Sequence, residues 1–219
     1  MQLLTVSDKE EPTIYSRSIK QKFGDVDLAI SCGDLPYYYI EYIISSLDIP
    51  LYYVLGNHAK EVEYGCSTPR EFPWGAVNLH KKVIRDPKTG LLLAGIEGSL
   101  LYNEGEHQYT QSEMWGMVSQ LVPTLLWNKV HYGRYLDIFV THAPPWRIHD
   151  EDDPAHQGAK AFNWLIKTFQ PTYHIHGHIH VYSPFTKTET KVGNTLVMNT
   201  YGYRKLTFPD NSELQTTDS

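Results

Sequence analysis

A set of polar residues stands at or just after the ends of short apolar runs. They occur in the segments SD, GD, GNH, TH and HGHIH and comprise Asp8, Asp34, Asn57, His58, His142, His178 and His180. Carboxylate and amide oxygens suit hard cations, and imidazole nitrogens suit the later transition metals. Each segment alone is also common in helix caps and turns. Their joint appearance in this order indicates a metal site.

The apolar runs before these residues are predicted to be strands. Most are apolar on both faces, as in strands covered on two sides, and they span residues 3–6, 28–31, 51–55, 91–95, 136–141, 173–176, 196–199 and 205–208. Helical patterns lie between several of them, at residues 13–23, 38–47, 111–127 and 158–169, and Pro123 is expected to interrupt the third. This alternation predicts an α/β domain. The carboxyl ends of its strands form one rim, where ligands bind.

Two segments predict antiparallel pairs within the sheets. Residues 83–85 and 91–93 flank DPKTG, whose proline and glycine suit a tight turn, and residues 192–194 form another turn signal. The expected fold is therefore an α/β fold with mixed sheets, a β-sandwich with helices outside. We expect one domain over residues 1–208 and a polar, frayed tail over residues 209–219.

The run HIHGHIH places histidines at alternate positions. On an extended strand their Cα atoms would lie in a line, about 6.6 Å apart, so they cannot all bind one ion. Gly177 is expected to end the strand. We therefore expect His174 to be a core or supporting histidine and His176 to support the site, whereas His178 and His180, beyond the glycine, are candidate ligands.

The ordered segments from Asp8 to His180 resemble the calcineurin-like metallophosphoesterase superfamily. The resemblance implies a β-sandwich of mixed sheets flanked by helices. It also implies two bound metal ions and the hydrolysis of phosphomonoesters or phosphodiesters.

The resemblance implies a role for each matching residue. Asp34 would bridge the two ions, and His58 would stabilise the phosphate or protonate the leaving oxygen. The other ligands divide between the ions, with Asp8 and His180 on the first and Asn57, His142 and His178 on the second. The mixture of oxygen and nitrogen ligands favours divalent transition metals, namely manganese, iron or zinc. Such a pair activates a water and offsets the charge of the reacting phosphoryl group.

Two departures from the family pattern concern the first ion and His58. The first motif usually has a histidine two residues after its aspartate, where this chain has Glu10. Glu10 is either a replacement ligand or a solvated charge. Many members orient the histidine of GNH with an acid three residues after the aspartate of GD, or follow that histidine with an acid. This chain has Tyr37 and Ala59 at these positions.

Loops next to this rim carry further candidate residues. Substrate contacts are expected from Arg147, His149, His156 and Asn103. The first three belong to a loop that contains DEDD, and the alternative interpretation is a solvated acidic loop. Tyr102, next to Asn103, is a further rim candidate, and for both residues the alternative is a core or turn role.

Composition limits the partners. Lys and Arg number 19 against 25 Asp and Glu, the net charge is −6, and the chain has no run of basic residues, so nucleic acid is not the expected partner. The expected substrate is a small phosphate ester such as a nucleotide, and the oligomeric state is left open. The 2 cysteines, Cys32 and Cys66, are expected to be buried free thiols. Because the sequence has no signal or membrane-spanning pattern, we expect a cytoplasmic protein that does not bind membranes.

The sequence is compatible with three functions. The leading hypothesis is a dinuclear metallophosphoesterase. A scaffold or binding module that keeps the fold without turnover is the alternative that Glu10, Tyr37 and Ala59 favour. A nuclease of the same superfamily is the third, and the acidic composition argues against it.

Overall fold

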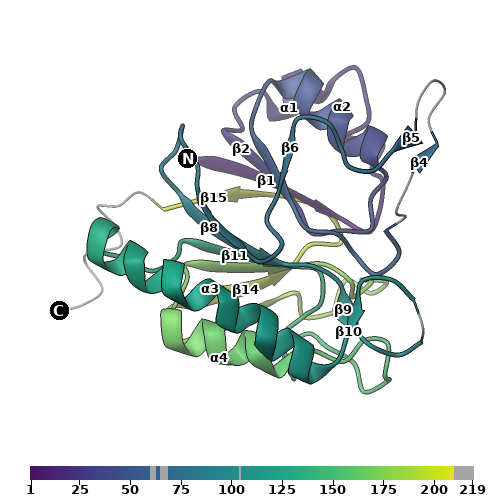
Figure 1. Cartoon of the computed structure of the whole chain (residues 1–219). Coiled ribbons are helices and arrows are strands. Elements are labelled where there is room, and N and C mark those ends of the chain that lie inside the picture. Colours follow the sequence, from purple (N-terminus) through teal and green to yellow (C-terminus); the bar gives the residue numbers. More distant parts are fainter. Residues whose placement is uncertain (60–62, 65–68, 104, 210–219) are drawn as a thin grey trace.

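Two β-sheets face each other, and helices cover the outer face of each sheet (Figure 1). The computed structural model describes residues 1–59, 63–64, 69–103 and 105–209. The first sheet has the order β15-β1-β2-β3-β6, formed by Gly202–Thr207, Gln2–Ser7, Leu28–Ser31, Leu51–Tyr53 and Ala76–Asn78. All neighbouring pairs are parallel except β15 with β1.

The second sheet has the order β13-β14-β12-β11-β8-β7, formed by Glu189–Val192, Thr195–Asn199, Tyr173–His176, Ile138–Thr141, Leu92–Ile96 and Lys82–Arg85. Its central strands are parallel, and β13 and β7 are antiparallel at its edges. Both antiparallel pairs expected from the turn signals are therefore confirmed. Two small pairs complete the strands, β4 (Glu63–Tyr64) with β5 (Pro69–Arg70) and β9 (Ser99–Leu100) with β10 (Gln108–Tyr109).

The strands are apolar on both faces because each sheet is covered on two sides, by the other sheet and by helices. Successive side chains of a strand point to opposite faces. In β1, Leu3 packs in the core between the two sheets, whereas Leu4 packs under the helices α1 (Ile19–Phe23) and α2 (Tyr37–Leu47). The second sheet is covered in the same way by α3 (Gln111–Tyr132) and α4 (Lys160–Phe169). The α/β fold with mixed sheets is confirmed.

Two helix predictions were wrong in detail. The helix α3 does not break at Pro123 but continues to Tyr132, where Gly133 ends it in the left-handed conformation. Pro123 is exposed, while Met117, Leu121 and others on the opposite side are buried against the sheet, so packing outweighs the cost of about 3 kcal/mol for an interior proline. Helix α1 covers only five residues, because residues 12–18 form turns in which Ser16 bonds backbone and side-chain oxygens.

Further expectations concern the cysteines, the C-terminal tail and membrane-spanning helices. Cys32 is a buried free thiol, as predicted, whereas Cys66 and residues 210–219 lie outside the described residues. In the described ranges, no helix combines the length and the apolar character needed to cross a membrane.

Candidate metal centre

The carboxyl ends of β1, β2, β3, β11 and β12 meet at one edge of the two sheets, on the right-hand side of Figure 1 near β9 and β10. Three of the predicted ligands at this edge adopt the left-handed conformation: Asp8 (φ 61°), Asp34 (φ 52°) and His178 (φ 69°). Such residues cost free energy and persist where the surrounding structure imposes them, which is common at functional sites. The backbone thus turns sharply at three of the predicted ligands.

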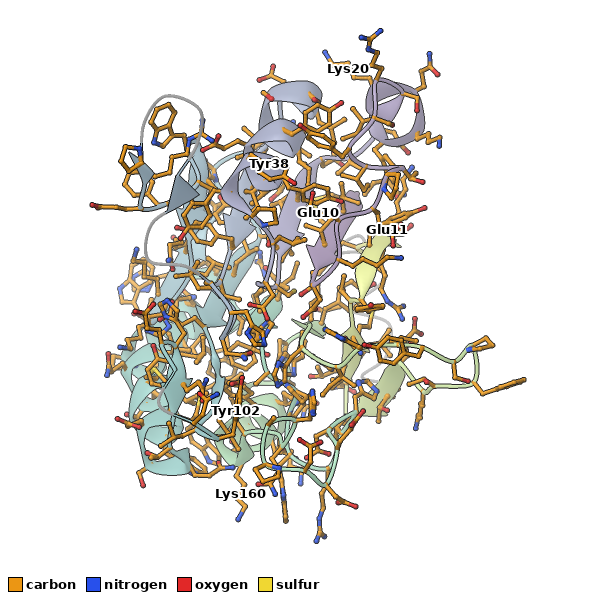
Figure 2. All side chains as sticks on the ribbon, turned by 90° about the vertical axis from the view of Figure 1, so that its right-hand side faces the viewer. Glu10, Glu11, Lys20, Tyr38, Tyr102 and Lys160 are labelled. Atoms are coloured by element: carbon orange, nitrogen blue, oxygen red, sulfur yellow. The ribbon has the colours of Figure 1, made fainter. Side chains whose placement is uncertain are left out.

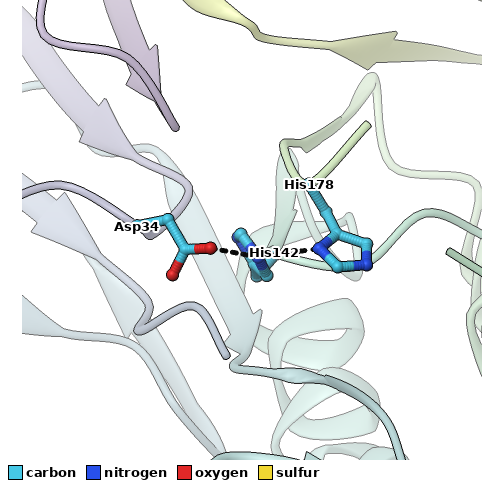
Figure 3. Close-up of side chains that lie close together, drawn as sticks. All are labelled: Asp34, His142 and His178. Carbon is cyan, nitrogen blue, oxygen red and sulfur yellow. Dashed lines mark hydrogen bonds and ion pairs between the residues drawn. The ribbon is translucent and has the colours of Figure 1, made fainter. Parts of the chain in front are cut away.

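Donor atoms of three predicted ligands converge on the imidazole of a fourth, His142, and the four residues form one group. Its Nε2 lies 2.9 Å from Oδ1 of Asn57. The same nitrogen lies 3.1 Å from Nδ1 of His178 and 3.2 Å from Oδ2 of Asp34, as Figure 3 shows. His142 is fully buried, His178 and Asn57 are buried, and the carboxylate of Asp34 is only 10% exposed. The side chains come from different loops, so only the folded chain brings them together.

The hydrogen bonds of His142 and His178 to backbone carbonyls indicate which ring nitrogen carries the proton in each. Nδ1 of His142 is 2.7 Å from the carbonyl oxygen of Cys32, and Nε2 of His178 is 2.7 Å from the carbonyl oxygen of Ala155. A carbonyl oxygen only accepts, so these nitrogens donate. In the neutral rings, Nε2 of His142 and Nδ1 of His178 therefore carry lone pairs that point at each other and at two oxygens.

This donor set fits a divalent cation. Ligands at right angles around an ion, each about 2.1 Å from it, lie about 3.0 Å from one another. The three distances from His142 Nε2, 2.9, 3.1 and 3.2 Å, have this size. Imidazole nitrogens mixed with carboxylate and amide oxygens favour manganese, iron or zinc over calcium.

Without an ion, protonation of His142 holds the same atoms together. Burial opposes the charged ring, but the neighbouring charge of Asp34 and its hydrogen bond raise the pKa of His142 to about 9. Burial also works against the Asp34 carboxylate, yet His142 and the backbone N–H of His58 lower the pKa of Asp34 to about 2. Burial and the charge of His142 lower the pKa of His178 to about 3. A cation that binds here displaces the proton of His142.

The predicted ligands of the first ion lie beside this group. The side chain of Asp8 is only 1% exposed, and its burial raises the pKa of the carboxyl group. Both of its oxygens accept from the backbone N–H of His178, at 3.1 and 3.0 Å. Nε2 of His180 is 3.9 Å from Oδ1 of Asp8, while its Nδ1 lies 2.9 Å from the hydroxyl of Tyr182. These two candidate ligands form a looser and more open pair than the four around His142.

Glu10 is exposed, and its carboxylate accepts a short hydrogen bond from the hydroxyl of Tyr38. Figure 2 shows Glu10 and Tyr38 close together in the upper half of the molecule. The neighbouring backbone is also held by this helix, because the hydroxyl of Tyr39 accepts from the N–H of Glu11 at 3.1 Å. The carboxylate of Glu10 is thus held by α2.

His58 is exposed at the same edge, and its backbone N–H donates to Oδ1 of Asp34 at 2.9 Å. This bond leaves the other oxygen of Asp34 to face His142. The glycine of GNH is required at this point, because a Cβ on Gly56 would lie 2.0 Å from Oδ1 of Asp34. Gly177 is required for the same reason, because a Cβ added at this position would lie 2.0 Å from Oγ of Ser7.

The residues that were expected to contact the substrate have different surroundings. The ring of His156 lies 5.2 Å from the ring of His178, and its Nδ1 is 2.8 Å from Asp153. The guanidinium of Arg147 lies over the ring of Trp146, at 4.3 Å. Asn103 is exposed and accepts from Gln108 and Gly105.

His149 is turned into the protein. His176 donates from Nδ1 to the carbonyl oxygen of Gly177, at 2.9 Å, so its Nε2 accepts from Nδ1 of His149, at 3.0 Å. The hydroxyl of Thr190 donates to the other nitrogen of His149, at 2.9 Å. Both ring nitrogens of His149 therefore have protein partners, and the ring ties its loop to β12 and β13.

Tyr102, a rim candidate for which a core or turn role was the alternative, lies at the centre. The amide nitrogen of Asn57 donates to the hydroxyl of Tyr102, at 3.0 Å. Tyr102 follows β9, and a tyrosine at the end of a strand is equally typical of packing, so its position along the chain was the only available signal.

A family model for calcineurin-like phosphoesterases matches residues 13–182. The chain belongs to the calcineurin-like phosphoesterase family. The segment that matches this family contains the four residues around His142, and it begins after Asp8 and Glu10.

Solved structures support the calcineurin-like phosphoesterase fold. One crystal structure has a TM-score of 0.60 at 16% identity, covering 94% of this chain and 94% of that chain. The crystal structure of TT1561 of Thermus thermophilus has a TM-score of 0.54 at 16% identity, covering 90% of this chain and 88% of that chain. Vacuolar Protein Sorting 29 from Cryptosporidium parvum, at 11% identity, covers 90% and 72% with a TM-score of 0.41, too low to support an inference. None of the curated proteins compared with the chain matches it.

Proposed function

We propose that this chain is a metal-dependent hydrolase that acts on small phosphate esters, diesters or monoesters. The observation that carries the proposal is the convergence of lone pairs from Asp34, Asn57 and His178 on Nε2 of His142, within 2.9 to 3.2 Å. Buried lone pairs that face one another repel unless a proton or a cation lies between them. Membership of the calcineurin-like phosphoesterase family makes a cation for phosphoester chemistry the expected occupant.

The chain's residues divide into those that hold ions and those that hold these ligands in place. Asp34, Asn57, His142 and His178 would hold one ion, and Asp8 and His180 would hold a second that shares Asp34. Bound ions of this kind activate a water and offset charge on the phosphoryl oxygens. The backbone carbonyls of Cys32 and Ala155 orient the two histidines, and such supporting bonds raise the basicity of a ligand.

His58 is proposed as the residue that gives a proton to the leaving oxygen. Its backbone N–H is fixed on Asp34, and its exposed position keeps the ring on the solvent side of the centre. A positioned imidazole that donates a proton contributes about 10²- to 10⁴-fold to a rate.

A small substrate agrees with the charge of the chain. The net charge is −6, and the loop beside the centre carries Glu151 and Asp153 close to His156. These charges repel a nucleic acid backbone, whereas a single ester can still bind through the ions. We therefore propose small diesters or nucleotides as the substrate class.

A second candidate function, a scaffold without turnover, is favoured by one observation. Glu10, at the position where the family usually has a histidine ligand, is exposed and bonded to Tyr38. A centre short of one ligand would bind the first ion weakly.

The two functions are separated by one set of measurements. The purified protein is analysed for metal, stripped with a chelator and reloaded with Mn²⁺, Zn²⁺ or Fe²⁺. Hydrolysis of p-nitrophenyl phosphate and bis(p-nitrophenyl) phosphate is then followed. The hydrolase is expected to cleave at least one ester in a metal-dependent way. A scaffold would purify with little metal, and Asp34→Asn would not change its metal content. Protein that binds two equivalents and cleaves neither ester would contradict the proposal.

A further inference from the structure

We infer that Tyr102 is a substrate-binding residue of this centre, whose hydroxyl donates a hydrogen bond to a phosphoryl oxygen held beside Asn57. The inference rests on the proposed function, because it takes the four residues around His142 as the place where the phosphate binds.

The hydrogen bond with Asn57 determines which further hydrogen bond the hydroxyl of Tyr102 can make. Oδ1 of Asn57 faces His142, at 2.9 Å, so the amide presents its Nδ2 to Tyr102, at 3.0 Å. An amide nitrogen only donates, and the phenol oxygen therefore accepts. The hydrogen of the hydroxyl is then left for another acceptor, and the described residues supply none.

The turn that carries Tyr102 is held firmly by its own side chains. The backbone N–H groups of Tyr102 and Asn103 both donate to Oε1 of Gln108, at 3.2 Å each. Nε2 of Gln108 donates to Oδ1 of Asn103, at 2.7 Å. These bonds fix the backbone of Tyr102, so its hydroxyl is positioned before any ligand binds. A preorganised donor loses little entropy on binding.

The base of the same turn is anchored on a buried carboxylate. Oε1 of Glu97 accepts from the hydroxyl of Tyr109, at 2.7 Å, and from Nδ1 of His107, at 3.1 Å. The next residue, Gly98, donates to the backbone of Leu55 and accepts from the backbone of Ala143, at 2.9 and 3.2 Å. The turn is therefore bonded to the loop that carries Asn57 and to the residue that follows His142.

Tyr102 also has access to solvent at the edge of the sheets where the candidate metal centre lies. Its side chain is half-buried, and Figure 2, which looks onto the edge where the strands end, shows Tyr102 in the lower half of this face. Glu10 and Tyr38 lie in the upper half of the same face. A phosphate held between the two halves meets the hydroxyl of Tyr102 next to Asn57. A hydrogen bond to a charged oxygen is about twice as strong as one between neutral groups.

The test uses the Mn²⁺-loaded full chain and inorganic phosphate as the probe. Tyr102→Phe removes only the hydroxyl, and Tyr132→Phe, at the far end of α3, is the matched control. Phosphate affinity is measured by calorimetry and bound manganese by elemental analysis. We expect Tyr102→Phe to weaken phosphate binding about tenfold at unchanged manganese content, as for a hydrogen bond to a charged group. Tyr132→Phe should match the wild type.

Two results would overturn the inference while leaving the proposed function intact. Phosphate binding by Tyr102→Phe equal to that of the wild type is the first. The second is a loss of manganese in Tyr102→Phe, with normal phosphate affinity in the fraction that remains loaded, which would make the hydroxyl a support for Asn57 alone. Wild-type protein that binds manganese but no phosphate, or binds no manganese, would overturn both proposals.

Discussion

Nε2 of His142 and Nδ1 of His178 face each other at 3.1 Å, and the other nitrogen of each ring is committed to a backbone carbonyl. Two neutral histidines in this arrangement present two lone pairs to one point. The pKa of His142 is raised to about 9. A proton on His142 therefore takes the place of the cation and relieves the repulsion between the two lone pairs. At the proposed metal centre, a proton and a cation would therefore compete for this pair.

Binding of the ion that His142 would hold is expected to release about one proton at pH 7. The folded, ion-free protein holds a proton on His142 up to pH about 9, so the proton must leave before the nitrogen can coordinate. Apparent affinity should rise about tenfold per pH unit between pH 7 and 8 and level off above about 9. Titration calorimetry of Mn²⁺ in buffers of different ionisation enthalpy measures the release. Affinity that is flat across this range would show that His142 is not a ligand.

Asp8→Asn and Glu10→Gln should have different effects on metal content. Asp8 is buried and lies 3.9 Å from His180, whereas Glu10 is exposed and bonded to Tyr38. We expect Asp8→Asn to lower the content from two ions to one and Glu10→Gln to leave it at two, by elemental analysis after equilibrium dialysis. Loss of an ion in Glu10→Gln would identify that residue as the replacement ligand. Circular dichroism checks that both variants fold.

His149→Asn should lower the free energy of unfolding by about 1–3 kcal/mol, because it leaves the buried Nε2 of His176 without its donor. Urea unfolding at pH 7.5 measures the change. His131→Asn, on the exposed surface of α3, is the control and should change stability by less than about 0.5 kcal/mol. If His149→Asn instead weakens phosphate binding at unchanged stability, His149 is the substrate contact that the sequence predicted.

The protein should lose stability as the pH falls from 6.5 to 4, in part through His80. Burial, reinforced by the charge of Lys81, lowers the pKa of His80 to about 4 despite the attraction of Glu97. Between pH 6.5 and 4 the unfolded chain takes up this proton and the folded chain does not, so acid favours unfolding. His80→Gln should flatten the stability profile in this window, measured by urea unfolding at several pH values. A profile as steep as that of the wild type would contradict this assignment.

Below this window Glu97 adds to the acid sensitivity. Burial works against its charged form, but hydrogen bonds from His107 and Tyr109 and the charge of His80 lower its pKa overall. A carboxyl group with a depressed folded pKa stabilises the fold above its usual value of 4.5 and loses that stabilisation as the pH falls through the folded pKa. The protein should therefore lose further stability as the pH falls below 4.5, in the same urea unfolding measurements.

The layers of the fold and the edge that holds the site follow from local sequence patterns. Apolar side chains on both faces of residues 3–6 require cover on two sides, and residues such as Asp34 and His142 stand where the strands end. These patterns repeat over short stretches, so they are visible without any tertiary information. The membership of the calcineurin-like phosphoesterase family follows from the same residues in order.

Features that depend on distant residues were not predictable. The contact between Asn57 and Tyr102 joins residues 45 apart, and the bond between Glu10 and Tyr38 joins residues 28 apart. The continuation of α3 through Pro123 depends on burial of its opposite face, which local propensity does not contain. Sequence alone therefore indicated which residues could bind a metal, and tertiary contacts determine how each is oriented.

The most direct test of the central claim is the rate of phosphate ester hydrolysis as Mn²⁺ is returned to chelator-treated protein, with Asp34→Asn as the reference. The two p-nitrophenyl esters serve as substrates. We predict no hydrolysis without the ion, a rate that rises with occupancy and saturates, and a loss of at least about 100-fold in Asp34→Asn. Saturated wild-type protein that hydrolyses neither ester, or an Asp34→Asn variant as active as the wild type, would contradict the account.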